Sequence, residues 1–192
     1  MQQPDITAIK QALRKKLRHR RRYFVRSLPD HHHALMFRIA PTPLAHLLGK
    51  ADLIGAYVAG PWEPDSINIA QRASAGRPIA LPYFSSRDAP MEFRLWGTDD
   101  PLESGPFGID QPEATAPPAS PDLLLMPLLG FDRQRNRIGQ GGGHYDRYLG
   151  AHPDCTRVGM AWAVQEVDAV PVEATDIPLN AILTEKEWIS AA

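Results

Sequence analysis

Residues 130–147 read GFDRQRNRIGQGGGHYDR, and the rest of the chain is best placed by working outward from this stretch. Four of the chain's 14 glycines fall within residues 139–143. The apolar run LLLMPLL, residues 123–129, comes before it and is typical of a buried strand. Tyr145, Tyr148 and Leu149 follow it at helical spacing. The sequence therefore predicts a strand, a glycine-rich loop and a helix in direct succession.

The composition of the loop favours phosphate as its ligand. Glycines allow backbone N–H groups to approach an anion closely, and a helix N-terminus adds partial positive charge. The pattern lacks the Lys-Ser/Thr ending of a Walker loop, and no clear acidic residue ends a second strand as a dinucleotide fold requires. A plain glycine-rich turn is the alternative. Two acids and two arginines close to the glycines, Asp132, Arg137, Asp146 and Arg147, favour the anion site.

The 192 residues are enough for one compact domain, expected to span residues 1–192. Apolar residues make up 43% and charged residues 22%, as in ordinary globular proteins. The one cysteine, Cys155, excludes an internal disulfide, indicates a reducing compartment and lies where a structural role is expected. No apolar run approaches the roughly 20 residues needed to cross a bilayer, and no apolar segment follows the basic N-terminus as in a signal peptide. We expect a cytoplasmic protein without a membrane partner.

Charge is unevenly distributed along the chain. The net charge is −1, but residues 1–26 hold nine Lys or Arg and one acid, a balance of +8, so the remainder carries −9. Residues 5–28 are predicted to form a helix with an apolar stripe, and residues 1–28 are expected to pack on the domain as a basic helix. The members of the stripe are Ile9, Leu13, Leu17, Phe24 and Leu28.

Lys10 and Arg14 are four residues apart, so both project from one face of this helix, which is expected to be otherwise solvated. For the basic run at 15–22, a solvated surface is favoured over an anion-binding surface. Nucleic acid is not an expected partner, because few aromatic residues alternate with the basic ones and no groove-reading motif is present. His31–His33 is interpreted as a surface turn rather than a metal site.

The remaining pattern predicts an α/β fold. Buried strands are expected at residues 51–59, 77–82, 157–163 and 181–184, the last being the terminal strand, and a helix at 66–75 with Ser66 as its N-cap. Residues 91–96 are expected to form an edge strand and residues 97–121 a long loop. Near-continuous apolar strands imply a sheet covered on both faces, hence a single three-layer Rossmann-like domain with a mainly parallel sheet.

Glu63 follows the first of these strands, at the end of the sheet where open α/β folds place their ligands. An acid in a solvent-exposed loop is the alternative interpretation of this residue.

The central stretch resembles the signature of the 5-formyltetrahydrofolate cyclo-ligases, also called 5,10-methenyltetrahydrofolate synthetases, which is G-F-D-x-x-G-x-R-L-G-x-G-x-G-Y-Y-D-R. The matching positions are Gly130-Phe131-Asp132, Arg137-Ile138-Gly139, Gly141, Gly143 and Tyr145-Asp146-Arg147. The resemblance covers most of the chain. Its other parts are Lys10 with Leu13-Arg14, Glu63 with Asp65, residues 107–112, and Gln165, Pro171, Asp176 and Thr184-Glu185.

The resemblance implies an ATP- and Mg²⁺-dependent enzyme that converts 5-formyltetrahydrofolate, in mono- or polyglutamylated form, to 5,10-methenyltetrahydrofolate. ATP is the co-substrate and Mg²⁺ the cofactor. The residues it places at ATP are Lys10, Arg14, Arg137, Ile138, Gly139, Gln140, Gly141, Gly142, Gly143, His144 and Tyr145. Those it places at the folate are Val58, Glu63, Gln140, Gly141, Gly142, Gly143 and His144. It gives catalytic roles to Arg137 and Tyr145 and metal ligation to Asp146 and Asp176.

The chain departs from the family pattern at several positions. Arg135 replaces a hairpin glycine, at a cost on the order of 1 kcal/mol if φ is positive there. Gln140 replaces an aromatic residue and His144 the first of two tyrosines. Further departures are Gln111, Thr175 and Asn180. Because Gln140 and His144 border the expected folate site, a diverged paralogue that binds ATP but acts on another small molecule, or is non-catalytic, is the alternative function.

Overall fold

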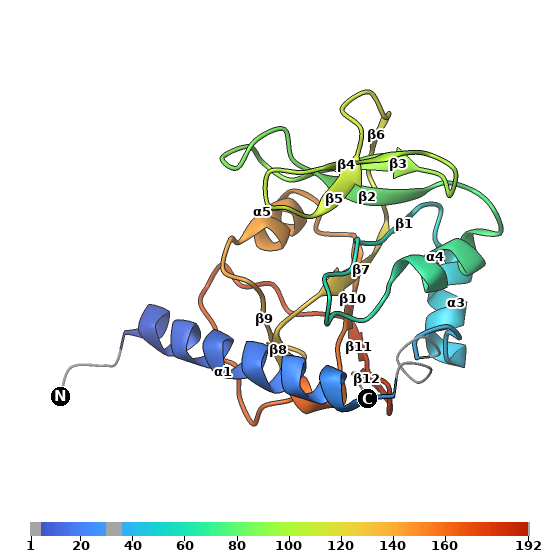
Figure 1. Ribbon diagram of the computed structural model, residues 1–192. Helices are drawn as coiled ribbons and strands as arrows, with labels where there is room; N and C mark the ends of the chain where they lie inside the picture. The colour runs from blue at the N-terminus through green and yellow to red at the C-terminus, as the bar shows by residue number, and fades with distance from the viewer. Residues whose placement is uncertain (1–4, 30–35, 192) are drawn as a thin grey trace.

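The structure, a computed structural model, describes residues 5–29 and 36–191 and shows helices around a central sheet (Figure 1). The helices are α1 (Ile6–Ser27), α3 (Thr42–Lys50), α4 (Ile67–Ser74), α5 (His144–Ala151) and the 3₁₀ helix η1 (Ala163–Gln165). The strands of the main sheet are β1 (Ile54–Gly55), β2 (Ile79–Tyr83), β3 (Glu92–Trp96), β6 (Pro118–Ala119), β7 (Leu123–Pro127), β10 (Thr156–Met160), β11 (Ala181–Leu183) and β12 (Trp188–Ser190). Two hairpins lie outside it, β4 (Leu102–Ser104) with β5 (Asp110–Pro112), and β8 (Gly130–Phe131) with β9 (Arg137–Ile138).

The central sheet is mainly parallel, as predicted. Within the described ranges its strand order is β12-β11-β10-β7-β1-β2-β3-β6. Neighbours from β11 to β2 pair in parallel, whereas β12, β3 and β6 pair antiparallel at the two sides.

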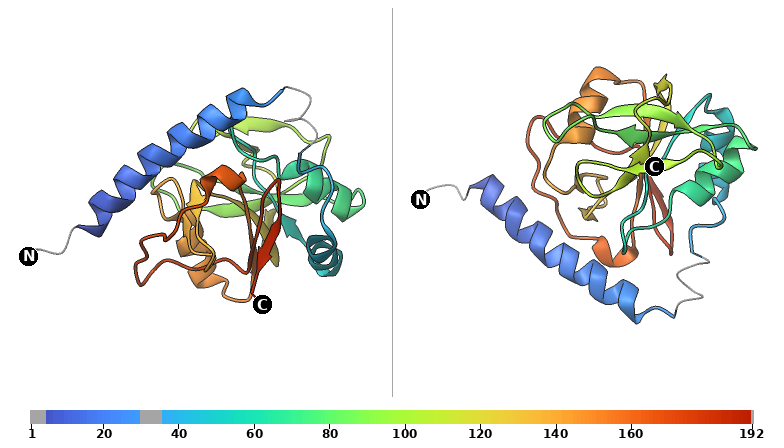
Figure 2. Two further views of the ribbon diagram at one scale, coloured as in Figure 1. Left: turned by 90° about the horizontal axis from the view of Figure 1, so that it is seen from below. Right: turned by 45° about the horizontal axis from the view of Figure 1, so that its top comes forward.

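Helices cover both faces of the sheet, which explains why β7 is apolar at nearly every position. Leu123 and Leu125 point to the face covered by α3 and α4, and Leu124 and Met126 to the face covered by α5. The predicted three-layer α/β architecture is therefore confirmed, and Figures 1 and 2 show the two helical layers on opposite sides of the sheet.

Helix α1 lies across the carboxyl ends of the parallel strands (Figures 1 and 2). The Asp5 side chain caps its first turn by accepting from Thr7 N at 2.9 Å. Leu17 is fully buried in a small cluster with Leu129 and Ile138, just beyond the end of β7. The predicted helix is confirmed, but the predicted apolar stripe is partly wrong because Ile9 is 39% exposed.

The β8–β9 hairpin is closed by the buried carboxylate of Asp132, which accepts from Asn136 N at 3.0 Å, Asn136 Nδ2 at 3.0 Å and Val170 N at 2.9 Å. Asp132 therefore serves this turn rather than a ligand. Arg135 has a φ of 68°, so a side chain occupies a left-handed position where the family pattern has glycine. Its carbonyl accepts from Leu179 N at 3.0 Å, which joins the hairpin to the segment before β11.

Four expectations about elements are corrected. The strand expected over residues 51–59 is reduced to β1, because the chain turns away to form the loop that carries Glu63. Residues 97–121 are not structureless, since they hold β4, β5 and β6. β3 is not an edge strand, because β6 pairs with its outer side, and the last strand is β12 rather than β11.

Ser66 precedes α4, but its side chain does not cap the helix. Its hydroxyl accepts from Tyr57 N at 2.9 Å and donates to Tyr57 O at 2.8 Å, closing the loop between β1 and α4 at its base. Asp65 performs the capping instead, because its Oδ1 accepts from Ile67 N at 2.9 Å.

Cys155 is buried, and burial raises the pKa of its thiol to about 11, which fits the structural role predicted for it. Among the described residues, no helix combines the length and the apolar character needed to span a membrane.

Candidate functional site

The glycine-rich loop lies directly beneath α1. Arg14 Nε donates to Gly139 O at 3.0 Å, and the guanidinium comes within 3.3 Å of where a Cβ on Gly141 would stand. Gly141 has a φ of 109° and Gly143 a φ of 64°, and these positive values favour glycine at both positions. Gly143 is the N-cap residue of α5, so the glycine-rich loop leads into a helix as predicted, but the β8–β9 hairpin separates its glycines from β7.

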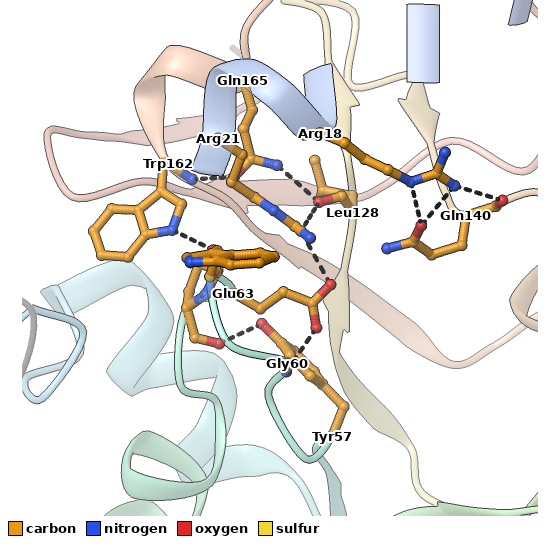
Figure 3. A network of polar contacts seen from close by, with 11 residues as sticks. Arg18, Arg21, Tyr57, Gly60, Glu63, Leu128, Gln140, Trp162 and Gln165 are labelled. Carbon is orange, nitrogen blue, oxygen red and sulfur yellow. Dashed lines mark hydrogen bonds and ion pairs between the residues drawn. The ribbon is translucent and has the colours of Figure 1, made fainter. Parts of the chain in front are cut away.

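Arg18, one turn further along α1, holds the next residue of the loop. Its guanidinium donates to Gln140 Oε1 at 2.9 Å and 3.1 Å and to Gln140 O at 3.3 Å. Figure 3 shows this pair beside a second contact made by Arg21. The side chain of Gln140 is thus directed toward the helix.

Arg137 and Asp146 form an ion pair on the other side of the loop. Arg137 Nη2 donates to Asp146 Oδ1 at 2.7 Å, Nη1 donates to Ile177 O, and the Arg137 side chain is only 6% exposed. Asp146 Oδ1 also accepts from Ile177 N at 3.2 Å. Asp146 therefore lies beside the segment that carries Asp176, so the two expected metal ligands belong to one region.

Lys10 is buried, so the expectation of an otherwise solvated face around it is wrong. Its ammonium donates to Glu173 Oε2 at 2.6 Å and to Asp176 Oδ2 at 2.5 Å. Burial alone would lower the pKa of Lys10, but the hydrogen bonds and charges of Asp176 and Glu173 raise it above its usual value. Lys10 is therefore firmly charged and ion-paired at the edge of the loop.

No cluster of three or more metal-ligating side chains occurs in residues 5–29 and 36–191. Asp146 and Asp176 each use one carboxylate oxygen in the contacts above, which leaves a second oxygen on each. Mg²⁺ is typically held by one or two carboxylates together with substrate phosphates and water. This donor set fits Mg²⁺ bound jointly with a nucleotide. His31–His33 lies outside the described residues.

Glu63 is held over the site by a turn whose sequence explains its shape. In Gly60-Pro61-Trp62-Glu63, proline occupies the second position that a β-turn favours, and Glu63 N donates to Gly60 O at 3.0 Å. The carboxylate folds back so that Oε2 accepts from Gly60 N at 3.1 Å, while Oε1 accepts from Arg21 Nη1 at 3.0 Å (Figure 3). The Glu63 side chain is only 12% exposed, which argues against a solvated loop acid.

Two tyrosines surround Glu63. Burial, followed by the charge of Glu63, raises the pKa of Tyr57 and also that of Tyr145, and Arg137 partly opposes the rise at Tyr145. Both phenols are therefore neutral hydrogen-bond donors at physiological pH. Tyr57 gives its proton to Pro64 O at 2.6 Å. Val58 follows Tyr57 and is half-buried against the core on the α3–α4 side.

His144 belongs to an aromatic group at the start of α5. Its ring lies 4.8 Å from that of Phe84 and 5.3 Å from that of Phe107, both in tilted or edge-on contact. Arg147 Nη2 donates to His144 Nδ1 at 3.1 Å, so the ring proton of neutral His144 is on Nε2, beside Gly142. Burial and the charge of Arg147 lower the pKa of His144, which keeps the ring neutral.

The structure thus brings most of the predicted site residues together, but the position of the Ile138 side chain differs from the prediction. Ile138 is 2% exposed and its side chain packs in the core with Leu17, so only its backbone could face a ligand. Sequence reasoning missed Arg18 and Arg21, since the run at 15–22 was interpreted as solvated surface. The spacing of Lys10, Arg14, Leu17 and Arg21 on one helical face is the signal that could have found Arg21.

Arg20 is also turned toward the protein, where its Nη1 donates to Val164 O and Glu166 O, each at 3.0 Å. The solvated interpretation holds for Lys15, Lys16 and Arg22, which are exposed.

The chain is similar to known proteins over most of its length. The sequence model described as the 5-formyltetrahydrofolate cyclo-ligase family matches residues 6–185. The 5-formyltetrahydrofolate cyclo-ligase of Mycolicibacterium smegmatis is 32% identical over 146 residues, which cover 71% of this chain and 75% of that protein. The protein of the same name from Haemophilus influenzae is 38% identical over 91 residues, 44% of this chain. The matched stretch spans about half, 49%, of the Haemophilus protein.

The fold is shared with a solved structure. The NMR structure of Aquifex aeolicus 5,10-methenyltetrahydrofolate synthetase superimposes with a TM-score of 0.72, covering 95% of this chain and 92% of that one. The sequences are 23% identical over this match, so the likeness concerns the fold.

The lowered pKa of His144 predicts a loss of stability in acid. An unfolded histidine titrates near pH 6.5, so below that pH the unfolded state binds more protons than the folded one. The stability that neutral His144 contributes is therefore complete above about pH 6.5 and falls as the pH decreases. We expect His144→Phe, which keeps a ring against Phe84 and Phe107, to lose less stability than wild type between pH 7.5 and 5.5.

Urea unfolding midpoints at the two pH values measure this difference. Arg147→Met removes one of the two causes of the shift and should give an intermediate pH dependence. Identical pH dependence in wild type and His144→Phe would contradict the prediction.

Proposed function

The chain belongs to the 5-formyltetrahydrofolate cyclo-ligase family, and we propose that it catalyses the ATP- and Mg²⁺-dependent cyclisation of 5-formyltetrahydrofolate to 5,10-methenyltetrahydrofolate, releasing ADP and phosphate. One observation carries the proposal. A largely buried carboxylate, Glu63, faces the same edge of the sheet as a glycine-rich loop that cations border on two sides, Arg14 from α1 and Arg137 from β9. A polyanion would pair with the cations beside the loop, and a ring with N–H groups would donate hydrogen bonds to Glu63.

The nucleotide's phosphates fit the loop at residues 139–143. Its glycines leave backbone N–H groups approachable, and α5 begins at His144 with its N-terminus toward the loop. Arg14 and Arg137 supply positive charge beside it, and Lys10 adds a third cation. Phosphoryl transfer depends mainly on positioning and charge neutralisation, which such a set provides.

Asp146 and Asp176 would hold the Mg²⁺ through the carboxylate oxygens that are not used in the contacts described above. When bound, Mg²⁺ supplies charge neutralisation at the phosphate oxygens.

In the proposed reaction the formyl oxygen of the folate attacks the γ-phosphorus of ATP. A P–O bond forms, the bond to the β–γ bridging oxygen breaks, and ADP leaves. The folate N10 then attacks the activated formyl carbon, the C–O bond breaks, phosphate leaves and N10 loses its proton. Arg137 neutralises charge on the moving phosphoryl group, and the neutral Tyr145 hydroxyl donates a hydrogen bond toward the reacting oxygens.

Glu63 would accept hydrogen bonds from the pterin ring, with Val58 at the side of the same loop. The backbone of the glycine loop and the aromatic group of Phe84, Phe107 and His144 would border the folate. The substrate includes mono- and polyglutamylated forms. The reaction is placed in the cytoplasm, because a chain with one buried cysteine suits a reducing compartment.

The alternative, a diverged paralogue, rests on Gln140 and His144. The contacts of His144 weaken it, because the imidazole keeps an aromatic surface against Phe84 and Phe107. The Gln140 side chain is held by Arg18, so the replacement of an aromatic residue by Gln140 leaves the glycine backbone of the loop unchanged.

Turnover decides between the two. Purified protein is incubated with 5-formyltetrahydrofolate, ATP and Mg²⁺, and formation of the methenyl product is followed by its absorbance. We expect product formation that requires both ATP and Mg²⁺. Absence of turnover at saturating substrates would remove the proposed function and leave the paralogue.

Asp146→Asn should remove most Mg²⁺-dependent turnover, by about 100-fold, because the amide keeps the shape of the side chain but not its charge. The measurement is the initial rate across a Mg²⁺ titration, with Asp168→Asn at an exposed position as control. A role in metal binding raises the Mg²⁺ concentration needed for half-maximal rate. A lower rate at an unchanged Mg²⁺ requirement would show instead that Asp146 acts only by holding Arg137.

Lys10→Ala should raise the KM for ATP by about 10-fold, since one cation near the phosphates is lost. It should also lower the free energy of unfolding by about 1–2 kcal/mol, less than for a fully buried ion pair, because Glu173 is 44% exposed. Lys15→Ala, on the exposed side of the same helix, is the control for both measurements. An unchanged KM for ATP would contradict the role of Lys10.

A further inference from the structure

The contact between Arg21 of α1 and Glu63 of the β1–α4 loop is a buried ion pair. Arg21 Nη1 lies 3.0 Å from Glu63 Oε1, and the two side chains are 7% and 12% exposed (Figure 3). Burying two charges costs several kcal/mol per ion, and well-packed apolar residues of similar size are often at least as stabilising. A purely structural contact at this place would not need charge.

The surroundings of Arg21 show that the fold makes little other use of its guanidinium. Its second acceptor, Leu128 O, is 3.4 Å away and already accepts from Gln165 Nε2 at 2.8 Å (Figure 3). Among the described residues, Arg21 Nε has no hydrogen-bond partner although it is buried. The short contact with Glu63 is therefore the main one that this side chain makes.

The Glu63 carboxylate retains capacity for a ligand. A carboxylate can accept about four hydrogen bonds, and Glu63 accepts one from Arg21 and one from Gly60 N. Both contacts fix the plane of the carboxylate, one from α1 and one from the turn that carries it. Tyr57 nearby gives its own proton to Pro64 O and does not occupy Glu63.

We infer that Arg21 is a positioning residue for the folate site, which holds the Glu63 carboxylate in an orientation that accepts hydrogen bonds from adjacent N–H donors of the pterin ring. This inference rests on the proposed function. It gives the basic helix a second task beyond the phosphates: Lys10 and Arg14 serve the nucleotide end of the site, and Arg21, two to three turns further along, serves the folate end.

Because the hydrogen bonds of Arg21 in the described structure go to Glu63 and Leu128 rather than to the glycine loop, its loss should affect the two substrates differently. Arg21→Met keeps the aliphatic stem and removes the charge. We expect kcat/KM for 5-formyltetrahydrofolate to fall by about 10- to 100-fold, mainly through KM, with little change in the KM for ATP. Arg21→Lys restores a cation that can donate to Glu63 and should recover part of the loss.

Glu63→Gln and the double variant Arg21→Met/Glu63→Gln complete the set. If Arg21 acts through Glu63, the double variant should be no worse than Glu63→Gln alone. Arg26→Met, an exposed arginine of the same helix, is the matched control and should behave as wild type. Urea unfolding of each variant shows whether it is folded, and Arg21→Lys with Glu63→Gln still tests the coupling if Arg21→Met does not fold.

The outcomes separate the inference from the proposed function. Wild-type turnover together with the selective folate effect, partial rescue by lysine and non-additivity supports the inference. Wild-type turnover with equal losses toward ATP and folate, no rescue by lysine, or additive losses overturns it and leaves the proposed function standing. Absence of both binding and turnover of 5-formyltetrahydrofolate by the wild type overturns the proposed function and, with it, this inference.

Discussion

The cationic face of α1 must find acceptors wherever the helix docks, and this requirement fixes where it lies. Leu17 and Val25 contribute about 1.5–3 kcal/mol each by burial, enough to hold a helix against the protein but not to set its register. Breaking a buried ion pair such as Arg21–Glu63 costs about 3–5 kcal/mol, and the part-exposed contacts of Lys10 contribute about 1–2 kcal/mol, so a helix shifted by one turn would lose as much through these two residues as its apolar contacts contribute. This accounts for part of the uneven charge of the chain, because Lys10 and Arg21 of the basic helix pair with Glu173, Asp176 and Glu63 of the acidic remainder.

The acceptors for these cations lie at the carboxyl ends of the parallel strands, where open α/β folds place their loops. Segments distant in sequence are thereby tied to a single helix. Lys10 holds Glu173 and Asp176, Arg14 and Arg18 hold the glycine loop, and Arg21 holds Glu63. The described helix thus acts as a common support for the proposed phosphate, metal and folate ends of the site. Precision at a site of this kind depends on such support, because each loop on its own is mobile.

The sequence was sufficient for the fold class and for the place of the glycine loop before a helix, and the reasons are physical. Apolar runs with covered faces on both sides identify a parallel sheet, and four glycines before a helix predict an anion loop, which stays a prediction. The partners of α1 could not be deduced, because a lysine on a predicted helix gives no indication of acidic residues more than 160 positions away. The hairpin of β4 and β5 was missed because its strands are three residues each and lack the alternation that marks a half-buried strand: β4 is mostly exposed, and β5 is buried at the two successive residues Gln111 and Pro112. The positive φ of Arg135 could be anticipated only because the family pattern has a glycine at this position.

The charges of the site neutralise one another in the described structure, and this bears on how the proposed ligands enter. Lys10 is paired with Asp176 and Arg137 with Asp146, so two of the three cations expected at phosphate are bonded to a carboxylate expected at Mg²⁺. A polyphosphate that binds alone pairs with the two cations and leaves the two carboxylates without their charged partners. A metal ion that binds alone pairs with the two carboxylates and leaves the two cations without theirs. Uncompensated charge in a half-buried site is costly, whereas a Mg²⁺–nucleotide complex supplies a partner to both sets at once. Under the proposed function, the exchange of ion pairs therefore favours the complex over either component, and the ion pairs of the described structure explain this selectivity.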